Sequence, residues 1–181
     1  VAQQLYEGVE VKGHGTVGLI TYMRTDSVRI SDEAQNMASN YIERKYGSMY
    51  IPEKPRQYKS KKNIQDAHEA IRPSNIDITP QIAKETLASD QYKLYTLIWN
   101  RFTASQMASA LIDTTTVDIK NGDYLFRASG SSVKFDGFMA AYEYINDDEE
   151  DNSKFPKLEE KDNLEKVSIN KSQHFTQPPA R

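Results

Sequence analysis

A tyrosine and an arginine two residues apart, Tyr22 and Arg24, are the residues of this chain best suited to covalent chemistry. A phenolic oxygen can attack a phosphodiester and form an ester with phosphorus, and a neighbouring guanidinium stabilises the charge that develops on the phosphoryl oxygens. An ordinary phenol has a pKa of about 10, so it needs help as a nucleophile but leaves readily when the ester is reversed. Thr25 and Asp26 follow as supporting polar residues. The alternative is that Tyr22 only packs, since the chain has 11 tyrosines.

A second segment, residues 68–74 (HEAIRPS), offers groups that could assist such a reaction. A short helical turn would place His68 and Arg72 on one face, although Pro73 disfavours the helical conformation at Arg72. There they could transfer a proton or hold a phosphate oxygen. Glu69 could orient either of them or be solvated. The alternative is a helix-capping histidine beside a surface arginine.

Two stretches of opposite charge stand out against a net charge of −3. The first is basic and is predicted to be a loop within residues 51–62; its charged members are Lys54, Arg56, Lys59, Lys61 and Lys62. The second, residues 147–162, has eight acidic and three basic residues, so it carries −5 and leaves +2 for the rest. Either both are solvated surface, or the basic stretch holds nucleic-acid phosphates while the acidic one faces away.

The first part of the sequence predicts helices around one short hairpin. Residues 1–7 continue a helix, and strands on either side of residues 13–15 form an irregular hairpin. The apolar run 17–20 is predicted to be a buried strand that leads into Tyr22. Ser31 is a helix N-cap, and Gly47 ends a helix of about fifteen residues. Its buried face is predicted to comprise Ala34, Met37, Ala38, Tyr41 and Ile42.

Two further helices are predicted before residue 107. Thr79 followed by Pro80 is typical of a helix start, and this short helix would extend to about residue 88. Ser89 or Asp90 begins a longer helix. Its buried face would comprise Leu94, Tyr95, Leu97, Ile98, Phe102 and Met107, with Trp99 in the same core.

Beyond residue 107 the apolar pattern alternates with a period of two. Residues 112–119 and 124–128 are predicted strands joined by a turn at Asn121-Gly122. Residues 132–135 could be another strand, residues 139–144 are possibly helical, and residues 163–170 are predicted to be a last strand. The expected fold class is α+β, with an α-rich unit at 1–107, a β-rich unit at 108–172 and a connection at 173–181.

Composition excludes several classes of site. Without cysteine there is no disulfide, thiolate metal site or cysteine nucleophile. We find no apolar run long enough to span a membrane, no signal peptide and no phosphate-binding Gly-x-x-x-x-Gly-Lys loop. The contiguous acids at 147–151 lack a metal-ligand spacing, so they are predicted to be solvated and no metal ligand is expected in this chain. A cytoplasmic setting fits these features.

Residues 18–27, GLITYMRTDS, resemble the active-site segment of the bacterial type IA DNA topoisomerases. Residues 68–74 are similar to the second active-site segment of the family, and residues 174–181, HFTQPPAR, are similar to the stretch that leads into its next domain. The topoisomerase I members are the closer match, because the topoisomerase III members usually have proline in place of Met23. Both ends of the chain look cut from a longer protein.

The resemblance implies relaxation of negatively supercoiled DNA by transient cleavage of one strand, through a 5′-phosphotyrosyl intermediate and strand passage. It implies Tyr22 as nucleophile, Arg24 as phosphate stabiliser, and His68 and Arg72 as additional phosphate or proton-transfer groups. It also implies a tyrosine-bearing domain with a helix-turn-helix-like arrangement, then part of a β-rich arch. The partners would be single-stranded or underwound DNA and the remaining domains of the same chain, in the nucleoid of a bacterium, with no membrane.

The resemblance further implies Mg²⁺, held by a domain outside these residues, and no requirement for ATP. Because the metal-binding domain lies outside these residues, the fragment alone is expected to be inactive. The competing interpretation is a non-catalytic DNA-binding or interaction module with Tyr22 as a packing aromatic. A tyrosine recombinase or a metal nuclease fits less well, because the order of the tyrosine and the basic residues differs and no metal-nuclease ligand spacing is present.

Overall fold

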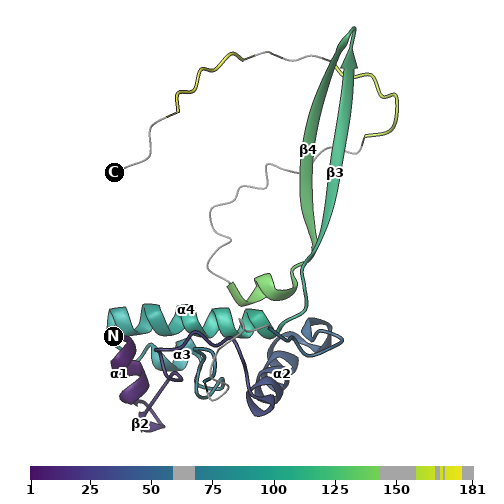
Figure 1. Cartoon of the computed structure of the whole chain (residues 1–181). Helices are drawn as coiled ribbons and strands as arrows, with labels where there is room; N and C mark the ends of the chain where they lie inside the picture. The colour runs from purple at the N-terminus through teal and green to yellow at the C-terminus, as the bar shows by residue number, and fades with distance from the viewer. Residues whose placement is uncertain (59–67, 143–157, 166–167, 169, 177–181) are drawn as a thin grey trace.

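The structure, a computed structural model, describes residues 1–58, 68–142, 158–165, 168 and 170–176. It is an α+β fold: a helical body lies beneath the long helix α4 (Ser89–Gln106), and a long antiparallel hairpin projects away from the body (Figure 1). Within the described residues, no helix is both long and apolar enough to cross a membrane.

The body begins with α1 (Ala2–Glu7) and the hairpin β1 (Val9–Val11) and β2 (Gly15–Val17), as the sequence predicted. The second strand is shorter than expected, however. Leu19 and Ile20 are buried, but the backbone N–H groups of both are directed to the carbonyl oxygen of Leu5, at 2.7 and 3.4 Å. The expected strand at 17–20 is therefore wrong beyond Val17, because the end of α1 takes the hydrogen bonds that a neighbouring strand would have made.

The predicted helix after the nucleophile segment is α2 (Asp32–Tyr46). Ser31 caps it by accepting a hydrogen bond from the N–H of Ala34, and Gly47 ends it at a φ of 101°. Ala34, Ala38, Tyr41 and Ile42 are buried as predicted, but Met37 is exposed. A short 3₁₀ turn, η1 (Ser48–Tyr50), follows.

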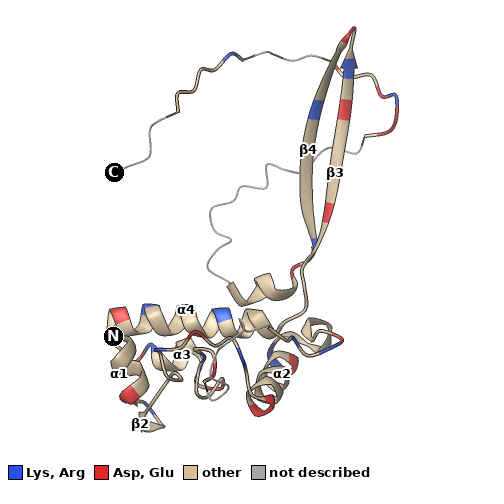
Figure 2. Ribbon diagram, in the orientation of Figure 1, with Lys and Arg blue, Asp and Glu red and all other residues tan. Residues whose placement is uncertain are grey.

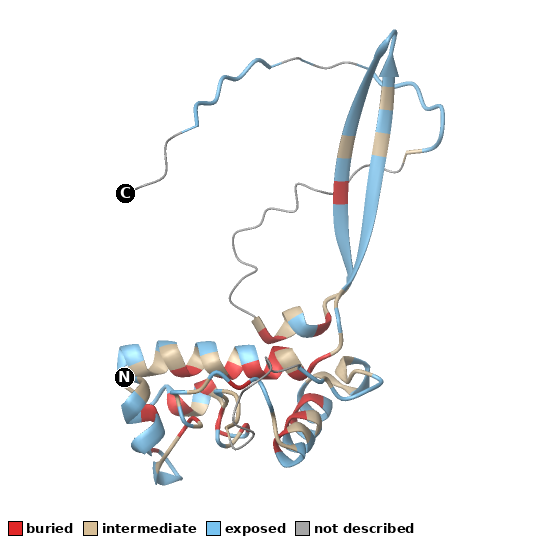
Figure 3. Ribbon diagram, in the orientation of Figure 1, coloured by how far each residue is buried: buried red, intermediate tan, exposed pale blue. Residues whose placement is uncertain are grey.

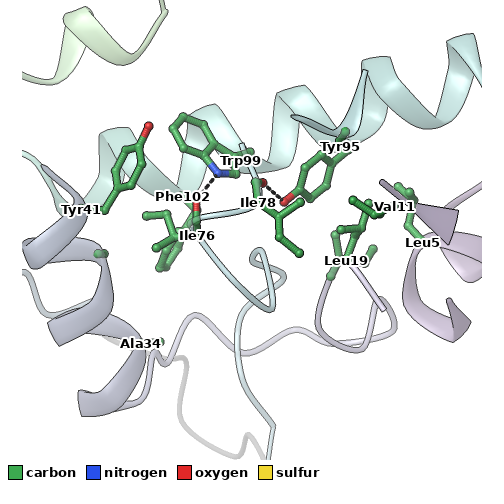
Figure 4. Packing of buried hydrophobic residues seen from close by; sticks show 13 residues of the cluster. Leu5, Val11, Leu19, Ala34, Tyr41, Ile76, Ile78, Tyr95, Trp99 and Phe102 are labelled. Carbon is green, nitrogen blue, oxygen red and sulfur yellow. Dashed lines mark hydrogen bonds between the residues drawn. The ribbon is translucent and has the colours of Figure 1, made fainter. Parts of the chain in front are cut away.

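The core of the body forms under α4 (Figure 4). The indole of Trp99 donates to the carbonyl of Ile76 at 3.0 Å, and the buried hydroxyl of Tyr95 donates to that of Ile78 at 2.6 Å. Thr79 caps the short helix α3 (Pro80–Ala83), which ends earlier than predicted and continues as turns. Leu97, expected in the core, lies on the solvent side of α4 at 62% exposure.

The projecting hairpin pairs β3 (Leu111–Asn121) with β4 (Tyr124–Phe135) around the predicted turn at Asn121-Gly122. The two strands expected at 124–128 and 132–135 are one continuous strand, because Gly130 and Ser131 stay paired with β3. The 3₁₀ helix η2 (Gly137–Tyr142) then returns to the body. The strand expected at 163–170 is wrong for residues 163–165, 168 and 170, which form none; its other residues lie outside the described part.

A cluster of contacts holds the base of this hairpin to the body. The hydroxyl of Tyr50 donates to Asp136 at 2.7 Å, and its ring lies 4.9 Å from that of Phe135. The backbone N–H of Ala108 donates to Tyr50, and its carbonyl accepts from Phe138. The hairpin thus joins the body where α4 ends.

Candidate active site

The two segments singled out in the sequence lie side by side in the structure. Ile20 forms an antiparallel bridge with Pro73. The N–H of Thr21 donates to the carbonyl of Arg72 at 2.9 Å, and the N–H of Ser74 donates to the carbonyl of Leu19 at 2.9 Å. Tyr22 therefore emerges from a backbone that is fixed by the second segment.

Thr21 fastens this junction with its side chain as well. Its hydroxyl donates to the carbonyl of Ala70 at 2.8 Å and accepts from the N–H of Arg72 at 3.0 Å. These bonds hold residues 70–74 in a non-helical path with bends at Ile71 and Ser74, so the helical turn expected through His68 and Arg72 is wrong for the described residues from 68 onward. The sequence reasoning missed Thr21, although a hydroxyl beside the candidate nucleophile was a visible signal.

Tyr22 stands between two other rings. The ring of Tyr6 meets it edge-on at 5.4 Å, and the ring of His68 lies 6.5 Å from it. Despite these contacts, Tyr22 remains 43% exposed. His68 was expected near Tyr22; Tyr6 was not, and nothing in its sequence neighbourhood indicated the contact.

Arg72 is paired with Glu69. Its Nε and Nη2 donate to one carboxylate oxygen of Glu69 at 3.1 and 2.6 Å, and its Nη1 donates to the carbonyl of Pro73. The other carboxylate oxygen of Glu69 accepts from the N–H of Ser31, the cap of α2. Partial burial opposes the charge on Glu69, but the hydrogen bonds from Arg72 and Ser31 and the charge of Arg72 outweigh it and lower the pKa of this carboxyl.

Arg24 differs from Arg72 in its surroundings. It is exposed, and within the described residues its guanidinium makes no ion pair or hydrogen bond. The backbone around it is shaped by its neighbours: the hydroxyl of Thr25 accepts from the N–H of Ser27 at 3.0 Å. Asp26 is exposed. A free cation two residues from an accessible phenol is suited to an anionic ligand.

The structure tests only part of the predicted basic stretch. Lys54 is exposed, whereas Arg56 donates to the hydroxyl of Ser109 at 2.7 Å and so supports the base of the β3–β4 hairpin. The other three, Lys59, Lys61 and Lys62, lie outside the described residues, as do the acids at 147–151. Figure 2 shows Lys and Arg spread over both the body and the hairpin.

No grouping of three metal-ligating side chains occurs among the described residues. Two acids belong to the candidate segments: Asp26 is exposed, and the oxygens of Glu69 are engaged by Arg72 and Ser31. Mg²⁺ is usually bound through one or two carboxylates together with water and substrate phosphates. The part of the chain that the structure describes offers no larger group of ligands at this site.

Comparison with known proteins gives a family match and a structural match. The sequence matches a family described as DNA topoisomerase over residues 1–181. The structure is similar to that of full-length topoisomerase I from Thermotoga maritima, with a TM-score of 0.69 and 42% sequence identity. That match covers 87% of this chain and 24% of the Thermotoga chain, so the chain spans about a quarter of that relative.

Proposed function

This chain belongs to the bacterial type IA DNA topoisomerase family, and from that membership we propose that it is the tyrosine-bearing part of a longer enzyme that relaxes negatively supercoiled DNA. The observation that carries the proposal is the exposed Tyr22, fixed at its backbone by the 70–74 segment and flanked by His68. Residues 1–107 would be the tyrosine domain, 108–172 part of the arch and 173–181 the connection to the next domain.

The reaction is a transesterification. The phenolic oxygen of Tyr22 attacks phosphorus, the bond to the 3′ oxygen breaks, and the DNA 5′ end is held as a phosphotyrosyl ester. The proton lost by the phenol is balanced by the one gained at the 3′ oxygen. Passage of the other strand and attack by the 3′ hydroxyl then restore the DNA. No ATP is needed, because the ester conserves the broken bond.

The assisting roles follow from how each side chain is engaged. Arg24 is free among the described residues and would bind the phosphoryl oxygens. His68, beside the phenol ring, would hold or move the proton. Arg72 has N–H groups left over after binding Glu69 and could contact phosphate while Glu69 and Thr21 keep its segment in place. Mg²⁺ would add charge stabilisation from ligands outside these residues.

DNA binding would involve single-stranded or underwound DNA. Lys54 and the lysines at 59, 61 and 62 would contact phosphates, which makes the affinity fall with added salt. Arg56, engaged by Ser109, is the least suited member of this set. A cytoplasmic, nucleoid-associated setting follows from a DNA substrate.

The test uses the full-length parent enzyme and single-stranded DNA. The trapped adduct is digested, and mass spectrometry identifies the modified peptide. We expect nucleotide on Tyr22, no adduct in Tyr22→Phe, and normal adduct in the control Tyr124→Phe on the hairpin. Adduct formation or plasmid relaxation by Tyr22→Phe would instead make this chain a non-catalytic DNA-binding module.

A further inference from the structure

The contact between α1 and the nucleophile segment is unusually close. An added Cβ at Gly18 would lie 2.5 Å from the carbonyl oxygen of Tyr6, so only glycine fits there. The N–H of Leu19 donates to Leu5 at 2.7 Å, and Leu5 is fully buried. The backbone of Tyr6 is therefore fixed relative to the chain that leads into Tyr22.

The side chain of Tyr22, by contrast, is only partly enclosed, at 43% exposure. A side chain can adopt several staggered χ1 conformers, and each additional conformer lowers the population of the reactive one. Within the described part of the chain, its ring contacts Tyr6, at 5.4 Å and an interplanar angle of 65°, and His68, at 6.5 Å and 52°. The edge-to-face geometry with Tyr6 is the favourable arrangement of an aromatic pair.

We propose that Tyr6 is a positioning residue that holds the ring of Tyr22 in the orientation from which its hydroxyl attacks phosphorus. The inference rests on the proposed function of Tyr22 as the nucleophile. Tyr6 acts through its ring and not through its hydroxyl, because the contact is between rings. The favourable energy of such a pair corresponds to roughly a threefold to tenfold bias in orientation.

The test measures single-turnover cleavage of an oligonucleotide by the full-length parent enzyme, together with the dissociation constant for the same oligonucleotide. For Tyr6→Leu we expect cleavage roughly threefold to tenfold slower with an unchanged dissociation constant. Tyr6→Phe keeps the ring and should retain the wild-type rate. Tyr124→Leu, the same change on the exposed hairpin, is the matched control. Tyr6→Met is a second aliphatic variant should Tyr6→Leu not fold.

Several outcomes would overturn the proposal. A wild-type rate in the aliphatic variants would show that the ring contact does not orient Tyr22. A slower rate caused by weaker binding would make Tyr6 a DNA contact, and loss of rate in Tyr6→Phe would implicate its hydroxyl. Tyr22→Phe is measured in parallel. If this variant still forms an adduct, the proposed function itself is wrong. If it forms none and Tyr6→Leu cleaves at the wild-type rate, only the positioning role of Tyr6 is wrong.

Discussion

The helical body and the β3–β4 hairpin are stabilised in different ways (Figure 3). The body encloses a cluster of buried side chains that includes Leu5, Tyr95 and Trp99. In the hairpin only Gly130 is buried, and most of its large apolar side chains are exposed, namely Leu111, Ile112, Tyr124, Leu125, Phe126 and Val133. The body thus relies on tertiary burial, and the hairpin on strand pairing and the contacts at its base.

The candidate active site belongs to the body, and the comparison explains why. A reactive side chain must be held by a backbone that does not move, and burial beneath α4 supplies that rigidity. A two-stranded ribbon without a packed face is only marginally stable. The hairpin therefore depends on the contacts of Tyr50 with Phe135 and Asp136, which join it to the body near the end of α4.

Removal of a core side chain should have the largest effect. Trp99→Ala deletes a buried ring and the hydrogen bond to Ile76, so we expect a loss of about 3–5 kcal/mol in the free energy of unfolding. Phe126→Ala removes an exposed ring from the hairpin and should cost less than about 1 kcal/mol. Urea denaturation followed by circular dichroism measures both. Equal losses would mean that the hairpin ring is buried in solution.

A smaller effect is expected at the base of the hairpin. Gly137 has a φ of 49°, and an added Cβ would lie 2.6–2.7 Å from backbone atoms of residues 108–110. Gly137→Ala should therefore destabilise by about 1–3 kcal/mol and speed hydrogen exchange in β3 and β4. Gly122→Ala, at a φ of 60° but in open space, is the control and should cost about 1–2 kcal/mol. Indistinguishable variants would show that the crowding at Gly137 is relieved by small shifts.

A pH-dependent effect is expected at Glu69. Its pKa in the folded chain lies below its ordinary value of 4.5, so ionised Glu69 stabilises the fold above that pH, and the contribution is lost as the pH falls through the lowered pKa. The difference in stability between wild type and Glu69→Gln should be constant from neutral pH to about 5 and then shrink. Thermal unfolding from pH 7 to 3 measures it. A difference that does not change with pH would mean that the Arg72 pairing does not form.

The smallest effect is expected for the ion pair on the hairpin. Arg127 donates two hydrogen bonds to Asp118, and this lowers the pKa of Asp118, but both groups are exposed to solvent and screened. Asp118→Asn should leave the thermal midpoint unchanged within the scatter of the measurement. A clear fall would show that the pair is shielded and that the hairpin relies on side chains as well as backbone.

Helix ends and tight turns could be predicted from the sequence, because the residues that cause them lie within the feature itself. A serine cap, a glycine terminator and an Asn-Gly turn act within a few residues, so α2 and the β3–β4 turn were predicted correctly. Periodicity predicted three of the buried residues of α4, Tyr95, Trp99 and Phe102, but it missed Thr103, Ala104 and Gln106. It also placed Leu97 in the core, because a pattern does not say how wide the buried face is. The candidate residues Tyr22, Arg24 and His68 were likewise visible as residue types in a motif.

Contacts between distant segments could not be predicted from the sequence, because they depend on which backbone groups form hydrogen bonds in the folded chain. The 68–74 segment has a helical spacing in sequence, yet hydrogen bonds to Leu19 and Thr21 hold the part from Ala70 onward in a non-helical path. A separate long-range contact, between Leu5 and Leu19, brings Tyr6 against Tyr22. The sequence motif thus determined which candidate groups are present, whereas the tertiary structure determined their orientation. The physical reason is that a hydrogen bond or ring contact forms only where the folded core brings both partners close together.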